Sequence, residues 1–157
     1  MKISLILIGK TTDKHIAALM DDYEARVKHY VGFDIIVIPD LKNTKALTEE
    51  QQRQAEGALI LKQLQPGDTV VLLDERGKEF RSIEFAEWME RKQHTVGKRL
   101  VFVVGGPYGF SPEVYARANE QLSLSRMTFS HQMVRLFFVE QIYRAQTIIR
   151  GEPYHHE

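Results

Sequence analysis

The stretch that most restricts how this chain can fold is an apolar run that ends at two glycines. Val101 to Val104 are all apolar, and Gly105, Gly106 and Pro107 follow them directly. A run this short and this rich in β-branched side chains indicates a strand buried on both faces, as in a parallel sheet. Ligands of open α/β sheets bind beyond the carboxyl ends of the strands, so the glycine turn is a candidate binding site.

A second apolar segment is followed by a polar turn. Leu122 to Leu124 lead into residues 125–130, Ser-Arg-Met-Thr-Phe-Ser. If the two strands lie close together, the backbone groups of both turns could wrap around one ligand. On spacing alone, a plain strand-to-helix connection explains the glycine turn equally well.

Strand-like and helix-like segments alternate along the chain. Strands are expected at residues 3–8, 33–38, 69–73 and 101–104, and helices at about 13–30, 46–64, 82–93, 112–120 and 131–150. Ser82 and Ser111 are the expected caps of the third and fourth helices. The alternation predicts an α/β fold with a mostly parallel sheet and helices on both faces.

Size and composition indicate one soluble globular domain over residues 1–157, with 43% apolar and 27% charged residues. Lys+Arg and Asp+Glu both number 21, so bulk charge does not indicate a nucleic-acid partner. The absence of cysteine excludes disulfides, thiolate metal sites and cysteine nucleophiles. No apolar run is long enough to span a bilayer, so we expect a cytoplasmic protein without a membrane partner.

Two motifs resemble nucleotide-binding signatures without matching them. Gly9-Lys10-Thr11-Thr12 follows the first strand like the end of a phosphate-binding loop, but the first glycine of that loop would fall at Leu5. The segment Gly105-Gly106-Pro107-Tyr108-Gly109 does not fit G-x-G-x-x-G in any register. Among the six histidines only the adjacent His155-His156 stand close in sequence, and no metal site is predicted.

The last expected helix has too many apolar residues for one stripe, which indicates burial on more than one side and suggests contact with another subunit. Arg135 and Arg144 lie among these apolar residues and need partners. Glu140 precedes Arg144 by four residues and could pair with it. An anion-binding role for Arg144 is equally compatible with the sequence.

Together these segments resemble a known family. The strand ending Leu72-Leu73-Asp74 is followed by VGGPYGFSPEV (104–114), SLSRMTFSHQMVRLFFVEQIYRA (123–145) and PYHHE (153–157). In order and spacing they resemble the SPOUT-class methyltransferases that modify N3 of a pseudouridine in 23S ribosomal RNA, over essentially the whole chain. The resemblance implies S-adenosylmethionine as methyl donor, a deep trefoil knot in the C-terminal third, and assembled ribosomes as substrate. It also implies a homodimer in which the partner subunit completes each active site.

The resemblance assigns roles to individual residues. Cofactor contacts fall on the strand ends and the two turns, at Leu73, Gly105, Leu124, Ser125, Arg126, Met127, Thr128 and Phe129. Tyr154 and His155 are expected near the target base, with Arg144 in contact with RNA or cofactor. Neutral imidazole suits removal of the N3 proton, so His155 is the expected base or proton relay. Tyr154 could stack on or orient the pyrimidine.

The C-terminus departs from the family pattern. Related chains end in His followed by one Arg or Lys, whereas this chain has His155-His156-Glu157. A permanent cation is thereby replaced by a histidine that is only partly charged near neutrality, which predicts weaker or more pH-dependent RNA contacts. Two other functions are considered: a non-catalytic ribosome- or RNA-binding module on the same fold, and a nucleotide-using enzyme of doubly wound topology. The second should carry a phosphate loop, which is not found.

Overall fold

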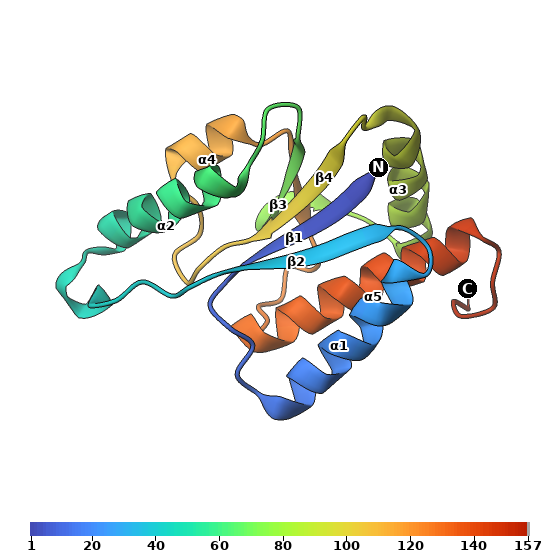
Figure 1. Ribbon diagram of the computed structural model, residues 1–157, viewed down its shortest axis with the longest axis horizontal. Coiled ribbons are helices and arrows are strands. Elements are labelled where there is room, and N and C mark those ends of the chain that lie inside the picture. The colour runs from blue at the N-terminus through green and yellow to red at the C-terminus, as the bar shows by residue number, and fades with distance from the viewer. Residues whose placement is uncertain (157) are drawn as a thin grey trace.

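The computed structural model describes residues 1–156, and its centre is a five-stranded sheet in which neighbouring strands are parallel. The strands are β1 (Lys2–Ile8), β2 (Gly32–Ile38), β3 (Thr69–Glu79), β4 (Arg99–Val104) and β5 (Glu120–Ser123). Their order across the sheet is β2-β1-β4-β3-β5 (Figure 1). The apolar run predicted to be buried on both faces is therefore the central strand β4, and the predicted α/β fold is confirmed.

Helices cover both faces of this sheet, as predicted. In the described residues these are α1 (Lys14–Lys28), α2 (Glu49–Gln63), α3 (Ser82–Thr95), α4 (Pro112–Arg117) and α5 (His131–Ile149). Helices α1, α3 and α5 lie on one face, and α2 and α4 on the other (Figure 1). Alternate residues of β4 serve the two cores, with Phe102 packed toward the first group and Val101 toward the second. Within residues 1–156 no helix is long and apolar enough to cross a bilayer.

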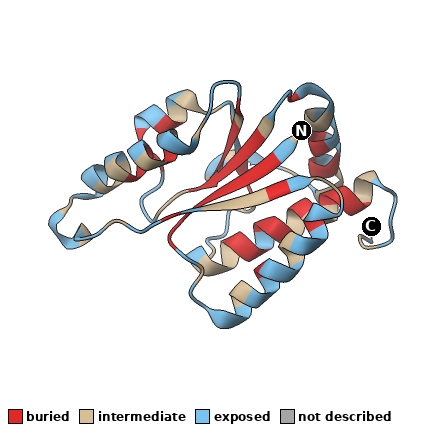
Figure 2. Cartoon of the chain, viewed as in Figure 1, coloured by how far each residue is buried: buried red, intermediate tan, exposed pale blue. Residues whose placement is uncertain are grey.

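The apolar character of α5 is explained largely within one chain. The helix lies between α1 and α3 and against the sheet, and Figure 2 shows long buried stretches along it. Phe138, Val139 and Ile142 have no exposed surface. Phe137, in contrast, is 40% exposed. Burial on more than one side is therefore confirmed, although α1, α3 and the sheet supply most of it.

Two predicted helix starts need correction. Helix α2 begins at Glu49 and not at residue 46, because Thr48 caps it and residues 44–46 form a separate 3₁₀ turn. Ser82 is the first residue of α3 and not its cap. The backbone N–H of the preceding residue, Arg81, donates to the side chain of Glu84 at 2.8 Å.

The fourth helix is shorter than predicted. It ends at Arg117 and not at residue 120, because Asn119 is hydrogen-bonded to β3. The Asn119 backbone N–H donates to the Val70 carbonyl, and the Asn119 side chain accepts from the Val70 N–H, both at 2.8 Å. This double contact directs the chain into β5.

Strand β3 is longer than predicted. It continues past Leu73 to Glu79, with a shift in its pairing with β5 between Leu73 and Lys78. Gly77 lies at the closest approach, where a Cβ would stand 2.5 Å from the backbone nitrogen of Leu122. A residue without a side chain therefore allows β5 to pair with β3 beyond the irregularity.

Candidate active site

A cavity of about 650 Å³ opens at the carboxyl ends of β3 and β4. Its walls come mainly from the bulged part of β3, the loop after β4, and the loop between β5 and α5. The lining residues are Arg53, Leu73, Asp74, Glu75, Arg76, Val104, Gly105, Gly106, Pro107, Tyr108, Gly109, Phe110, Tyr115, Leu122, Ser123, Leu124, Ser125, Met127, Thr128, Phe129, His131 and Val134. The two turns singled out in the sequence thus face one shared space.

Seven of the eight expected cofactor contacts line this cavity: Leu73, Gly105, Leu124, Ser125, Met127, Thr128 and Phe129. Arg126 does not. Its side chain is 89% exposed, and its Nε donates to Glu79 Oε1 at 3.0 Å. Motif spacing therefore located the loop, but the side chain of Arg126 is directed to a surface ion pair.

The loop after β4 is folded tightly over residues 105–111. An isolated bridge joins Gly106 to Gly109, and Gly109 has a positive φ of 78°. A Cβ at Gly105 would lie 3.0 Å from the ring of Phe110, which itself is buried. Ser111 then caps α4 through the Val114 N–H at 3.3 Å, as predicted. The loop backbone is thus held close against the cavity.

Serine side chains shape the second loop. The Ser123 hydroxyl donates to the Ser125 carbonyl at 3.0 Å, and the Ser125 Oγ accepts from the Met127 N–H at the same distance. Ser130 caps α5 by accepting from the Met133 N–H at 3.1 Å. Local side-chain-to-backbone bonds therefore set the turn that leads from β5 to α5.

A polar network that motif spacing did not indicate stiffens the bulge of β3. Asp74 accepts hydrogen bonds from the backbone N–H of Arg76, at 2.9 Å, and from the hydroxyl of Tyr115. Arg76 in turn donates to the Tyr115 oxygen at 3.2 Å. Burial raises the pKa of Tyr115, and the bond to Asp74 raises it further. The only sequence signal for this network was the acid directly after the strand.

The C-terminal tail is organised around Glu140 on α5. One oxygen of Glu140 accepts from Arg144 Nη2 at 2.6 Å and from the Tyr154 hydroxyl at 2.8 Å. The guanidinium of Arg144 also lies over the ring of Tyr154, 4.8 Å from its centroid. The predicted pair of Glu140 with Arg144 is thus confirmed. In addition, Glu140 binds a residue fourteen positions further along the chain.

These contacts determine which atoms of Tyr154 and His155 carry protons. Burial raises the pKa of Tyr154, and its bonds to Tyr23 and Glu140 raise it further, so its hydroxyl stays protonated. Arg144 Nη1 lies 3.0 Å from His155 Nδ1. Since a guanidinium can only donate, Nδ1 accepts, and the neutral ring carries its proton on Nε2.

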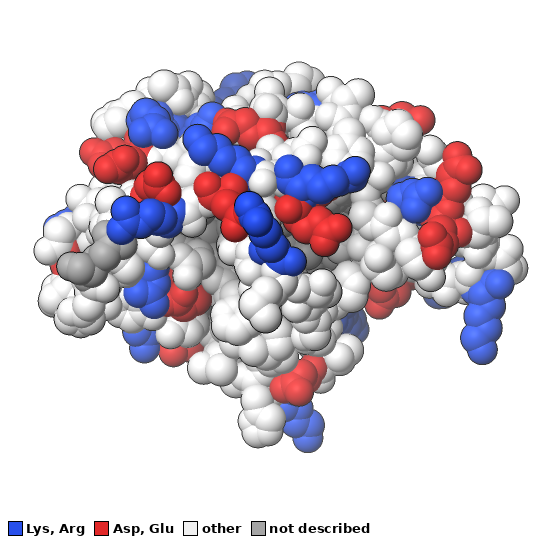
Figure 3. Space-filling model, turned by 180° about the vertical axis from the view of Figure 1, so that it is seen from behind, with Lys and Arg blue, Asp and Glu red and all other residues white. Residues whose placement is uncertain are grey.

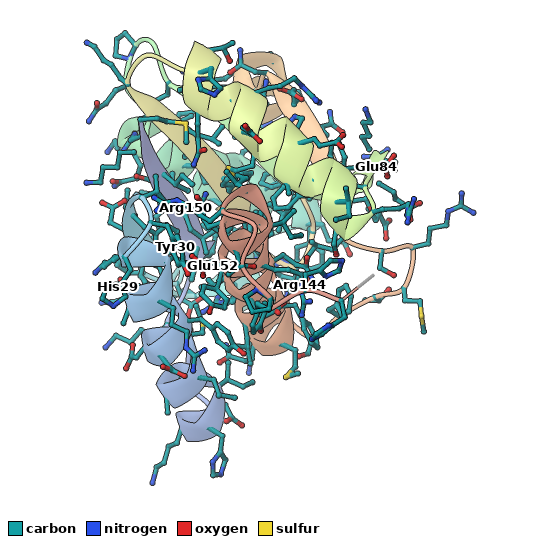
Figure 4. The ribbon with its side chains drawn as sticks, turned by 90° about the vertical axis from the view of Figure 1, so that its right-hand side faces the viewer. His29, Tyr30, Glu84, Arg144, Arg150 and Glu152 are labelled. Atoms are coloured by element: carbon teal, nitrogen blue, oxygen red, sulfur yellow. The ribbon has the colours of Figure 1, made fainter. Side chains whose placement is uncertain are left out.

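A second contact attaches the tail to the end of α1. The Tyr30 hydroxyl donates to Glu152 Oε2 at 2.6 Å, and the Arg150 guanidinium lies 5.4 Å from the centroid of the Tyr30 ring. The bond to Glu152 raises the pKa of Tyr30 to about 12. Figure 4 shows these three residues together near the C-terminal end of α5, with Arg144 on α5 itself.

The structure does not bring all the expected site residues together within one chain. No described residue beyond Val134 lines the cavity, so Arg144, Tyr154 and His155 lie outside it. Figure 1 shows the tail at the opposite end of α5 from the loop that forms the cavity wall. The expected cofactor residues and the expected base-contacting residues therefore form two separate groups.

Arg135 is used inside the protein. It is buried, and its guanidinium donates to the carbonyls of Ile8 at 2.6 Å and Gly9 at 2.8 Å and to the Thr11 hydroxyl at 3.2 Å. The expected need for partners is confirmed. Gly9 adopts a positive φ of 79° in a plain strand-to-helix turn, as predicted for this near-match to a phosphate loop.

Charged side chains of both signs are mixed on the face seen from behind. Figure 3 shows Lys and Arg beside Asp and Glu over the upper part of this face, with few charges below. Ion pairs such as Arg126–Glu79 and Lys92–Glu120 bring opposite charges together on the protein. RNA contact on this face would therefore depend on individual residues more than on one basic surface.

Comparison with known proteins identifies the family. The family described as "Predicted SPOUT methyltransferase" matches residues 1–155. The chain belongs to the SPOUT methyltransferase family. Proteins named "Ribosomal RNA large subunit methyltransferase H" from Phocaeicola vulgatus and Bacteroides thetaiotaomicron are 63% and 62% identical to it over 157 residues, covering all of both chains. The relative from Porphyromonas gingivalis is 54% identical over the same extent.

A solved structure agrees at the level of the fold. A probable methylase family protein from Haemophilus influenzae superposes with a TM-score of 0.54 at 14% identity, covering 95% of this chain and 66% of that one. The SPOUT family also implies the C-terminal trefoil knot. The alternation of strands and helices in the sequence predicted the α/β class but not the knot, because ordinary topology rules disfavour knots.

SPOUT methyltransferases use S-adenosylmethionine, so the predicted cofactor and the predicted methyltransferase activity are confirmed. The cavity fits such a group. Its volume of about 650 Å³ lies within the range of small-molecule sites. Leu73, Leu122 and Leu124 supply an apolar wall, and the two loops supply backbone donors and acceptors. Residues 105–110 and 124–129, apart from Arg126, line this cavity and would hold the cofactor.

Proposed function

We propose that this protein transfers a methyl group from S-adenosylmethionine to N3 of a pseudouridine in 23S ribosomal RNA, within the large subunit or the whole ribosome. The observation that carries this proposal is the 63% identity to a ribosomal RNA large subunit methyltransferase over the whole length of both chains. The match includes both loops of the cavity and the C-terminal tail. Because ribosomes are the substrate, we infer that the protein works in the cytoplasm.

When bound, S-adenosylmethionine supplies a methyl group that its positively charged sulfur already activates. The chain then has two tasks: to hold the acceptor nitrogen in line with the methyl carbon, and to help remove the N3 proton. The loops at 105–110 and 124–129 serve the first task by fixing the donor. We assign the second task to the tail.

The bonds of the tail suggest how it could act. Tyr154 keeps its proton and donates it to Glu140, so it can stack on the base or orient it by accepting a hydrogen bond. His155 cannot accept a proton at Nδ1 while Arg144 donates there. An RNA phosphate that bound Arg144 would draw the guanidinium away and free that lone pair. Arg144 would thus couple RNA binding to the activation of His155 as a base. His156 replaces the family's terminal cation, and Glu157 lies outside the described residues.

We further propose a homodimer in which the tail of one protomer completes the site of its partner. Two observations support it. The cavity and the tail lie apart within one chain, and two large apolar residues near the cavity are uncovered, Met127 at 78% and Phe137 at 40% exposure. Burying these side chains against a second copy would stabilise the pair.

The test of the reaction is methyl transfer from labelled S-adenosylmethionine to ribosomes from cells that lack this gene. The modified nucleoside is then identified by mass spectrometry. A methyl group on N3 of pseudouridine is the expected product. If cofactor binds by calorimetry but no ribosomal nucleoside is labelled, the proposed substrate is wrong. If cofactor does not bind, the protein is better described as an RNA-binding module on this fold.

Mixed dimers test the shared site. One subunit carries His155→Ala, and the other carries Leu124→Arg, which blocks the cavity. If the tail acts on the partner, the mixture regains activity, because the cavity of the first subunit meets the tail of the second. If the tail acts on its own cavity, neither subunit is competent and the mixture stays inactive.

A further inference from the structure

One face of α2 holds the loop that follows β4. Three residues at helical spacing, Arg53, Glu56 and Gly57, contact this loop. Arg53 Nη1 reaches the Tyr108 carbonyl at 3.5 Å. A Cβ at Gly57 would stand 2.4 Å from Ser111 Oγ, so α2 packs directly on the start of α4. The middle residue, Glu56, lies beside Gly106 of the loop.

The carboxyl group of Glu56 occupies the space beside Gly106. A Cβ built on Gly106 would lie 2.4 Å from Glu56 Oε1 and 2.6 Å from Oε2. Gly106 has no positive φ, so its backbone would accept an alanine, and the obstacle is the carboxyl group. Glu56 does not line the cavity, whereas Gly106 does. The acid thus supports the loop from outside the cavity.

Glu56 is an unusual residue for this position. It is 4% exposed, and although Oε2 accepts from Gln52 at 3.2 Å, Oε1 has no hydrogen-bond partner within residues 1–156. Burial raises the pKa of this carboxyl group, and the negative charge of Asp40 raises it further. Buried acids with an unpaired oxygen are costly, and an apolar side chain of equal size would pack here at lower cost. Departures of this kind are expected where function requires them.

We propose that Glu56 is a positioning residue for the cofactor loop: its carboxyl group, wedged against Gly106, sets where residues 105–109 stand in the cavity wall. Gly106 is then required to be glycine because of Glu56, and not because a side chain there would meet the cofactor. This inference rests on the proposed function, since the loop is taken to bind S-adenosylmethionine.

The test is a double-mutant cycle on cofactor affinity, measured by calorimetry with S-adenosylmethionine alone. Gly106→Ala should weaken binding about ten-fold, the scale expected when a well-packed site is overfilled. Glu56→Ala in the same chain should restore affinity to within about three-fold of wild type, because it vacates the space that the new methyl group needs. Glu56→Gln keeps the shape and should bind like wild type. Gly97→Ala is the matched control, since a Cβ at Gly97 meets nothing within 4 Å.

Methyl transfer measured over a range of cofactor concentrations separates positioning from general damage. Gly106→Ala should raise the KM for S-adenosylmethionine while leaving kcat within about two-fold of wild type. If wild type binds cofactor and Gly106→Ala binds it equally well, the inference is wrong while the proposed function stands. The inference is also wrong if Gly106→Ala loses affinity and the added Glu56→Ala substitution does not restore it. If Glu56→Ala does not fold, the comparison rests on Glu56→Gln. Wild-type affinity in Glu56→Gln together with weak binding in Gly106→Ala supports the inference, whereas weak binding in Glu56→Gln overturns it. Absence of binding in wild type itself would instead refute the proposed function.

Discussion

Replacing Glu140 by glutamine should loosen the tail that carries Tyr154 and His155. One Glu140 oxygen accepts from Arg144 at 2.6 Å and from Tyr154 at 2.8 Å. The side chains of Glu140 and Arg144 are only 16% and 25% exposed, so water screens this pair incompletely. Glutamine keeps the size and one acceptor but removes the charge that strengthens both bonds.

The magnitude follows from the two bonds. Hydrogen bonds to a charged group contribute roughly 1.5–3 kcal/mol, and neutral ones roughly 0.5–1.5 kcal/mol, so each bond loses about 1 kcal/mol. The total of about 2 kcal/mol corresponds to a shift of about 30-fold toward the undocked tail. The contact between Tyr30 and Glu152 stays intact, and the rest of the fold should not change.

The NMR signals of the Tyr154 and His155 side chains measure this shift, because these side chains contact Glu140 and Arg144 only while the tail is docked. The Glu152 N–H is bonded to the Thr147 carbonyl at the end of α5 and should keep its protection from hydrogen exchange. Methyl transfer to ribosomes, measured in parallel, should fall as the tail undocks. Glu24→Gln is the matched control: it removes the acid of another i,i+4 pair, with Lys28 at 3.1 Å, that does not touch the tail. Unchanged signals of Tyr154 and His155 and unchanged methyl transfer in Glu140→Gln would refute the role given to Glu140.

Two further predictions concern the buried pair of Arg99 with Asp68, whose side chains are 12% and 2% exposed. Arg99→Ala should lower the free energy of unfolding in urea by about 3 kcal/mol, because it leaves a buried carboxylate without its partner; a loss below about 1 kcal/mol would contradict this. Burial pushes the pKa of Asp68 up, but bonds from Arg99 and Gln65 outweigh it and leave the pKa below its ordinary value. The stabilisation by this carboxylate is therefore fully present above the pKa that Asp68 has in the unfolded chain, and it is lost as the pH falls through the lower pKa of the folded protein. In urea titrations at decreasing pH, the free energy of unfolding of Asp68→Asn should therefore fall less steeply than that of wild type.

Features set by neighbouring residues could be predicted from the sequence. The strand at Val101–Val104, the cap at Ser111 and the pair of Glu140 with Arg144 all depend on spacings of a few residues. The two turns after apolar runs also predicted where the cavity would lie.

Features set by distant contacts could not be predicted in this way. The helix expected to reach residue 120 ends early because Asn119 binds Val70, 49 positions away. The extension of β3 depends on Gly77 meeting Leu122 across the sheet. Arg126 belongs to a cofactor-contacting run by motif, yet its side chain pairs with Glu79. No periodicity indicated the knot, which follows from the family alone.

Helix α5 joins the cavity wall to the tail, and its length therefore restricts which insertions and deletions the chain can tolerate. Its first turns carry His131 and Val134 in the cavity wall, and its middle carries Glu140, which holds the tail. An α-helix turns about 100° and rises about 1.5 Å per residue. Inserting one residue between Val134 and Glu140 would therefore point Glu140 to a different side while the cavity stayed in place. Length variation in this segment should be tolerated far less than substitution, and insertions should accumulate in exposed loops such as residues 40–47.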